Sequence, residues 1–399
     1  MKDIPGNLPL SAYHAMAVDR VRQIGASNKT CLVGGDRCPT AINSHSVPVA
    51  ALTRIADDGH VYTFPSPTHE EMEAIYNGGS HRPRPCGINR ALTYYGFCGR
   101  HDDLVFADVE KHDIEPTPRQ ASLLHFRAYS RALHLNMTAG DALRAISDAR
   151  RPDNHEAQEA LSVLASYSPR QLEAFADLER QCASMDPLGL SAAASTFDYI
   201  FMRFDCVPDV MCSTLFTPIY DIEGRFLLPL AKPGELESCQ SISVTMSADS
   251  AGGFLLLAWN RNDTITDAFV RTFAESGYDL NRLIAVIFGN TENYCFRRQW
   301  WDALDDASRA FLMYCASVIF LNIADRHRDH LEYMHQLVRE RRAVYVEWPV
   351  RSILRDVFPG GTHYTDGGTT HPTAAHVEGK DSNGPNKGHA LDAQKDARK

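Results

Sequence analysis

The sequence predicts an α+β protein, because its residue pattern changes three times along the 399 residues. A stretch that holds spaced cysteines comes first, from residue 31 to 103. Apolar residues at intervals of three and four follow between 119 and 186, which is the spacing of amphipathic helices. From residue 196 short alternating segments indicate strands, and helical spacing returns at residue 264. We therefore expect an N-terminal metal-binding module, a helical segment, and a mainly antiparallel sheet covered by helices.

These changes divide the chain into five expected parts. They are an N-terminal helical segment, a zinc-binding module, a helical region, an α+β domain and a disordered tail, at residues 1–28, 29–115, 116–190, 191–357 and 358–399. The tail consists mostly of Gly, Thr, His, Asp, Lys and Asn. It has too few aliphatic residues to bury a core, so we expect it to remain unfolded.

Within these parts, spacing and turn residues place the individual elements. Helices are expected at residues 13–21, 120–135, 139–149, 155–165, 169–184, 264–275, 280–288, 299–303 and 307–324. Residues 55–64 are expected to hold a helix end, a Gly-containing turn and a short strand, and further strands are expected at residues 197–204, 215–220, 225–230, 241–246 and 253–259. Residues 65–85 carry Pro, Gly and His without periodicity, and this composition predicts a long flexible loop.

Composition excludes several classes of protein. The formal net charge is −10, which disfavours a protein that coats nucleic acid. No run approaches eighteen apolar residues and the first residues lack the apolar core of a signal peptide, so we expect no membrane partner. The ten cysteines are unevenly spaced, several of them in apolar segments, which suits reduced thiols better than a disulfide framework. A cytoplasmic protein is the resulting expectation, and its oligomeric state is not predicted.

Two cysteine-bearing pairs suggest a metal site. Cys31 and Cys38 flank a loop rich in Gly and Asp, and Cys98 and His101 form a C-x-x-H pair. Four ligands of this kind in two pairs suit tetrahedral zinc. The alternative is that Cys31 and Cys38 are small core residues. That role is the one expected for four other cysteines, Cys206, Cys212, Cys295 and Cys315.

Between the pairs, the segment INSHSVP places His45 just before a proline and an apolar run at 49–56. With the two pairs it resembles the HNH-type treble clef over residues 29–110, although Ser44 stands where that group usually has an acidic residue. The combined pattern SHS, GHVY and GFC-x-x-HD also resembles an uncharacterised bacterial protein family, which implies no function.

The resemblance to the HNH-type module implies roles for particular residues. Cys31, Cys38, Cys98 and His101 would be structural zinc ligands. His45 would be the general base, and Asp102 would help hold a catalytic divalent ion such as Mg²⁺ or Mn²⁺. The implied function is a metal-dependent nuclease that acts on DNA or RNA, with a role in bacterial defence.

A basic segment accompanies these residues. Between His81 and His101 there is no acidic residue, and three aromatic residues are interleaved with four arginines, Arg82, Arg84, Arg90 and Arg100. Such a segment could contact phosphates and bases. The alternative, which the usual weakness of charge runs favours, is a solvated loop with ordinary arginines.

Two hypotheses therefore remain open for the whole chain. The first is the nuclease, in which His45 deprotonates water. The second is a non-catalytic interaction or regulatory protein in which zinc has only a structural role. In that case His45 would replace Cys31 or Cys38 as a ligand. They differ in whether His45 points toward the metal or away from it.

A second polar site lies late in the chain. Residues 289–293 form the turn GNTEN, closely followed by Trp300 and Trp301. Its glutamate, Glu292, could bind a small ligand. Composition favours the simpler interpretation of a loop beside buried aromatic residues.

Overall fold

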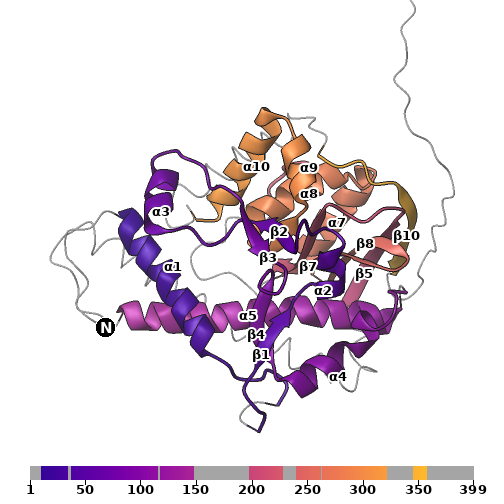
Figure 1. Cartoon of the computed structure of the whole chain (residues 1–399). Coiled ribbons are helices and arrows are strands. Elements are labelled where there is room, and N and C mark those ends of the chain that lie inside the picture. The colour runs from indigo at the N-terminus through magenta and orange to yellow at the C-terminus, as the bar shows by residue number, and fades with distance from the viewer. Residues whose placement is uncertain are drawn as a thin grey trace, which may run out of the picture. The chain divides into compact units, whose positions relative to one another are not determined.

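The structure is a computed structural model that describes residues 10–34, 37–115, 117–147, 197–227, 240–261, 263–320 and 345–356. All of these belong to one compact unit, residues 1–366 (Figure 1). They form helices, a two-stranded sheet and an eight-stranded sheet, and every strand pairing among them is antiparallel. The predicted α+β class is confirmed.

The eight-stranded sheet has the strand order β10-β5-β8-β7-β6-β9-β2-β3. Its strands are β2 (His60–Thr63), β3 (Arg84–Gly87), β5 (Phe197–Phe204), β6 (Val210–Phe216), β7 (Ile242–Asp249), β8 (Gly252–Asn260), β9 (Tyr294–Phe296) and β10 (Val350–Asp356). The small sheet pairs β1 (Ile42–His45) with β4 (Thr93–Phe97). Two strands of the expected zinc module, β2 and β3, thus extend the sheet of the expected α+β domain.

Helices pack on the large sheet and around the small one. They are α1 (Leu10–Ser27), α2 (Val49–Thr53), α3 (His69–Tyr76), α4 (Gly99–Glu110), α5 (Pro118–Ser147), α7 (Thr264–Glu275), α8 (Leu280–Asn290), α9 (Arg298–Ala303) and α10 (Asp306–Val318). None of these described helices combines the length and the apolar character that crossing a membrane would need.

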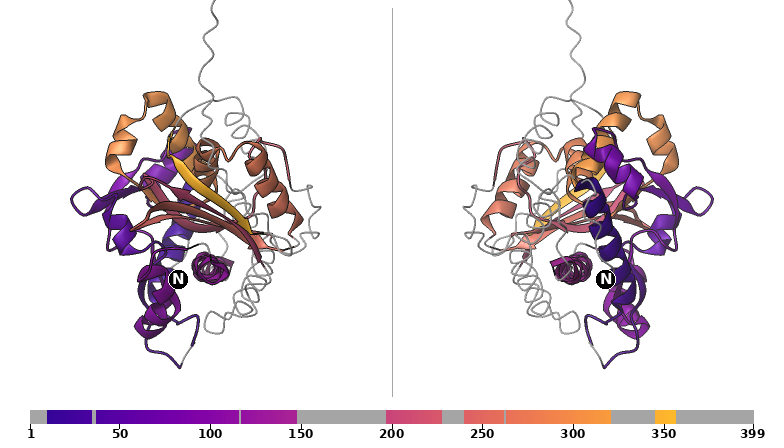
Figure 2. Two further views of the ribbon diagram at one scale, coloured as in Figure 1. Left: turned by 90° about the vertical axis from the view of Figure 1, so that its right-hand side faces the viewer. Right: turned by 90° about the vertical axis from the view of Figure 1, so that its left-hand side faces the viewer.

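The two faces of the large sheet differ in chemistry. Strand β7 directs Ile242, Val244 and Met246 into the main apolar core, which it shares with α7 and α8. The alternate residues of β7, Ser243 and Thr245, are buried on the opposite face, where α5 packs. Figure 2 shows α5 nearly end-on beneath the sheet. Helix α5 also contacts α1, α4 and β4, so it lies between the large sheet and the metal-binding residues.

The continuity of helix α5 differs from our prediction. We predicted a break between residues 135 and 139, but a single helix of 30 residues runs through this region. The polar side chains there bond back into the helix: the Asn136 amide donates to the Ala132 carbonyl, and the Thr138 hydroxyl to the His134 carbonyl. These bonds satisfy polar groups that would otherwise compete with helical structure. The helices expected at 155–165 and 169–184 lie outside the described residues.

Residues 65–85 are not the loop that we predicted. They contain α3 and the start of β3. A capping box begins α3, because the Thr68 side chain accepts from the Glu71 amide while the Glu71 carboxylate accepts from the Thr68 amide. Met72 and Ile75 are buried on this helix. The sequence therefore contains the T-x-x-E pattern of a helix start, but the prolines and glycines on both sides led us to predict a loop.

Other strand boundaries also differ from the sequence prediction. The strand expected at 215–220 begins earlier, as β6, and only an isolated bridge joins Tyr220 to Phe226. Strands β1, β3, β4, β9 and β10 were not among the expected strands. Strand β9 has three residues, too few for a period-two pattern to be recognised.

Phe64 connects the β2–β3 insert to the main core. Its ring centroid lies 5.5–6.1 Å from the rings of five neighbours, His81, Phe288, Tyr294, Phe296 and Trp301. Its side chain is 4% exposed. The insert is therefore fixed by aromatic packing in addition to strand pairing.

We expect Phe64→Ala to lower the free energy of unfolding by about 3–5 kcal/mol, because it leaves a cavity among these rings. Chemical denaturation followed by tryptophan fluorescence measures this. Phe226→Ala is the matched control, since Phe226 is 42% exposed. Equal stability of the two variants would contradict the packing described for Phe64.

Candidate metal centre

Four side chains from two parts of the chain converge beside the small sheet. Cys31 and Cys38 come from the loop that precedes β1, whereas Cys98 caps the N-terminus of α4 and His101 lies in its first turn. Backbone hydrogen bonds fix the loop, from the Leu32 amide to the Gly96 carbonyl (2.9 Å) and from the Ala41 amide to the Lys29 carbonyl (2.8 Å). The two predicted pairs are thus brought together.

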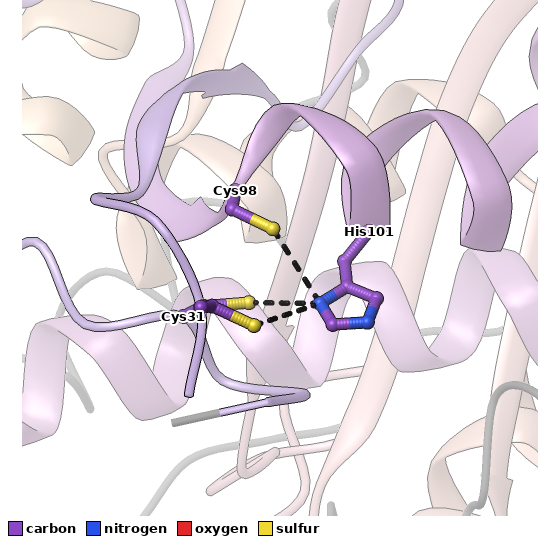
Figure 3. A group of neighbouring side chains, drawn as sticks. Cys31, Cys98 and His101 are labelled. Carbon is purple, nitrogen blue, oxygen red and sulfur yellow. Dashed lines mark hydrogen bonds between the residues drawn. The ribbon is translucent and has the colours of Figure 1, made fainter. Parts of the chain in front are cut away.

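The distances among these four residues suit one metal ion. Nδ1 of His101 lies 3.4, 3.3 and 3.5 Å from the Sγ atoms of Cys31, Cys38 and Cys98, and all four ligand atoms lie within 4.8 Å of one another. A tetrahedral ion with bonds of about 2.3 Å to sulfur and about 2.0 Å to nitrogen would separate S and N by about 3.5 Å. Figure 3 shows Cys31, Cys98 and His101 pointing toward one another. The group could hold a metal ion.

The site is so compact that there is no room for a side chain at Gly34. A Cβ atom added to Gly34 would lie 2.1 Å from the Sγ atom of Cys38 and 2.9 Å from Cε1 of His101. Both distances are far below van der Waals contact. The glycine of the loop therefore lets the backbone approach the ligand atoms closely.

The thiols of the centre differ in their affinity for protons. Burial raises the pKa of Cys31, but hydrogen bonds from the backbone at Cys98 and Gly34 and from other neighbours outweigh it and lower this pKa to about 6. For Cys38, burial and the neighbouring sulfurs raise the pKa to about 11. Several thiolates so close together repel one another, and a bound cation would remove that repulsion.

His45 is separate from this group. It ends β1, and its Nε2 lies 2.9 Å from the carbonyl oxygen of Ile88. Because a carbonyl can only accept, Nε2 carries the proton in this hydrogen bond, and Nδ1 is left as the basic nitrogen of the neutral ring. Among the described residues, the Cys/His group of four does not include His45.

Asp102 follows His101 directly on α4. Burial raises the pKa of its carboxyl, while the charge of Arg127, the hydroxyl of Ser44 and the charge of His45 act in the opposite direction. Of these influences on the pKa of Asp102, the charge of His45 is the smallest. The sequence pattern singled out both of them. His45 ends β1 opposite Thr93, the first residue of β4, whereas Asp102 lies on α4, which follows the last residue of β4.

Arg127 is the residue that sequence reasoning missed. Its side chain is fully buried, donates to Glu110 at 2.5 Å and lies over the Phe106 ring at 3.8 Å. Nε and Nη1 of Arg127 have no hydrogen-bond partner among the described residues. The only signal in the sequence is an arginine within a helix segment of otherwise mostly apolar residues.

The four arginines of the basic segment lie on different elements. Arg84 is on β3 and pairs with Glu71 of α3. Arg90 lies in the turn before β4, Arg100 is on α4, and Arg82 precedes β3; all four are exposed. The pairing of Arg84 reduces its availability for a phosphate.

Comparison with protein-family models, with curated proteins and with solved structures found no match to this chain. Functional inference therefore depends on the sequence pattern and on the geometry of the site.

We expect Cys98→Ser to remove the metal and to lower the melting temperature, because ligand binding is coupled to folding of the loop. Elemental analysis of the purified protein measures the metal, with about one ion per chain expected for four ligands. Cys206→Ser is the control, since Cys206 lies outside the group. Unchanged metal content in Cys98→Ser would contradict the site.

We also expect metal affinity to fall as the pH is lowered. Cys38, with its pKa raised to about 11, is protonated at neutral pH without metal, so binding must displace its proton. Lower pH favours the protonated thiols and hence the metal-free protein. Titration with a chelator at pH 8 and pH 6 should show easier removal at pH 6; equal removal would be inconsistent with thiolate ligands.

Proposed function

We propose that this chain is a metal-dependent nuclease of the HNH-like type, with a structural zinc ion and a separate catalytic site. The observation that carries the proposal is the placement of His45. It ends the first strand of the small sheet, outside the group of metal ligands, and its charge is one of those that lower the pKa of Asp102 on the helix that follows the second strand.

The order of the elements supports a treble-clef-like module. A loop with two cysteines precedes β1, β1 pairs with β4, and β4 leads into α4, whose N-terminus supplies Cys98 and His101. Residues 46–92 are an insert between the two strands, and they supply β2 and β3 to the large sheet.

Zinc is the metal that we assign to the four ligands. Three sulfurs and one imidazole form a soft donor set, which favours zinc over magnesium or calcium. A site with four protein ligands leaves no open position, and this is characteristic of a structural ion. When bound, the ion would join the loop to the start of α4 and so fix the positions of β1 and Asp102.

His45 would act as the general base. With Nε2 held by the Ile88 carbonyl, Nδ1 can accept a proton from water. The oxygen of that water would form the new bond to phosphorus, and the bond from phosphorus to the leaving nucleoside oxygen would break. The leaving oxygen would take a proton from solvent, so that the step is a hydrolysis with no other reactant.

Asp102 would hold a second, exchangeable cation such as Mg²⁺ or Mn²⁺. Such an ion supplies charge stabilisation for the phosphate as bonds change. The charge of Arg127 opposes the effect of burial on the pKa of Asp102 and so favours the carboxylate form that binds cations. The substrate would be DNA or RNA, contacted in part by Arg82, Arg90 and Arg100, which are exposed near this module.

We expect His45→Ala to reduce cleavage of DNA or RNA in Mg²⁺ or Mn²⁺ by at least about 100-fold, because it removes the general base. Its zinc content and melting temperature should stay close to those of the unmodified protein. Gel assays on single- and double-stranded substrates, together with elemental analysis, test both halves of this statement. His60→Ala is the matched control, since His60 is an exposed histidine on β2.

Two results would contradict the proposal. If His45→Ala releases zinc, His45 is a ligand. The better account is then a non-catalytic interaction protein in which zinc has only a structural role. If the unmodified protein cleaves no nucleic acid with either cation, the catalytic assignment of His45 and Asp102 fails, whatever the zinc content.

A further inference from the structure

The polar turn before β9 contains an asparagine that forms hydrogen bonds to two distant segments. Asn293 is 1% exposed, and its side-chain nitrogen donates to the Ser46 hydroxyl at 2.8 Å and to the Ser213 carbonyl of β6. Ser46 is the residue after His45 and is also buried. The contact therefore joins the large sheet to the end of β1, between residues that are 247 positions apart in the sequence.

Neighbouring hydroxyl groups fix this asparagine. The Thr291 hydroxyl accepts from the Asn293 backbone amide at 3.0 Å and from the Thr214 hydroxyl of β6 at 2.6 Å. Both threonines are buried. A buried network of this kind is rigid, because breaking one of its bonds leaves a buried polar group without a partner. Asn293 is therefore held in a fixed position relative to β6.

The turn that joins β3 to β4 contacts both His45 and Ser46. Ile88 begins this turn, and its carbonyl accepts from Nε2 of His45 at 2.9 Å. Leu92 ends the turn, and its carbonyl accepts from the Ser46 backbone amide at 2.9 Å and from the Ser46 hydroxyl at 3.0 Å. Because that hydroxyl gives its one proton to Leu92, it is an acceptor for Asn293. The two ends of one turn thus hold the proposed base and the residue after it.

The backbone of Leu92 is strained. Its φ is 54°, in the left-handed region that costs free energy for residues other than glycine. Such conformations persist where the surrounding structure determines them, and they cluster at functional sites. The next residue, Thr93, pairs with His45 across the small sheet. The two bonds from Ser46 therefore hold a strained residue that immediately precedes the pairing partner of His45.

We propose that Asn293 is a positioning residue for His45; this inference rests on the proposed function. By donating to the Ser46 hydroxyl, Asn293 keeps that hydroxyl directed at the Leu92 carbonyl. This fixes the backbone of the turn that also holds the His45 ring. Without the bond from Asn293, the turn would relax toward an unstrained conformation and the ring would lose its fixed orientation. A displacement of about 1 Å in a catalytic group can lower a rate by about 100-fold.

Asn293→Asp tests the inference with little change in size, because a carboxylate cannot donate a hydrogen bond to Ser46. We expect kcat for cleavage of DNA or RNA to fall by about 10- to 100-fold, with KM changed by less than about twofold. Assays are made well below the melting temperature of each variant, so that unfolding does not contribute. Asn290→Asp is the matched control, since the Asn290 amide donates within its own helix, to the Val286 carbonyl.

Ser46→Ala is the second variant, and it decides the question if Asn293→Asp does not fold. It removes the hydroxyl that Asn293 contacts, so we expect a similar loss of kcat. The double variant should lose no more than either single variant, because both break the same contact. In a His45→Ala background, either variant should leave the residual rate within about twofold, because Asn293 acts through His45. A further large loss in that background would overturn the inference.

Nuclear magnetic resonance separates this inference from the proposed nuclease. In protein with ¹⁵N-labelled histidine, the Nε2 proton of His45 should exchange slowly with water, because the Ile88 carbonyl holds it, and His45→Ala identifies its signal. Exchange about tenfold faster in Asn293→Asp or Ser46→Ala, but not in Asn290→Asp, supports the positioning role even if the chain cleaves no nucleic acid. Free exchange in the unmodified protein, unchanged exchange in both variants, or unchanged kcat in a chain that does cleave overturns it.

Discussion

The burial of α5 is the constraint on which the rest of the structure depends. Every residue from 121 to 130 is buried, because the large sheet covers one side of the helix while α4, β4 and α1 lie along other sides. A helix in this position must carry apolar residues around most of its circumference. Any charge on it must then be satisfied locally, as Arg127 is in part by Glu110 and Phe106.

The metal centre bears on the stability of the loop that precedes β1. The loop from 28 to 41 contains few apolar side chains, and Cys31 and Ala41 are its buried ones. Such a loop gains little from the hydrophobic effect. Four ligands around one ion would replace the missing core, while the backbone contact to Gly96 sets where the loop lies on β4. Metal binding by the loop and packing against α5 would therefore together fix the positions of His45 and Asp102.

Sequence reasoning succeeded where a pattern was local. Helix α7 has the predicted ends at Thr264 and Glu275, and the C-x-x-H pair predicted two neighbouring ligands on one helix turn. It failed where long-range pairing decides the structure. The three residues of β9 form a strand because β6 and β2 flank them. Arg127 was not singled out either, since its partners Glu110 and Phe106 lie on another helix, which packs against it only in the folded chain.

The place of β9 between β6 and β2 has a consequence for how the chain can be divided. Since residues 46–92 supply the strands that cover one side of β9, a fragment that begins after residue 116 would leave its backbone amides and carbonyls open to solvent. Exposed sheet edges of this kind pair with other chains. The half of the protein whose residue pattern suggests an independent domain would therefore be prone to self-association when expressed alone, because β2 would no longer pair with β9.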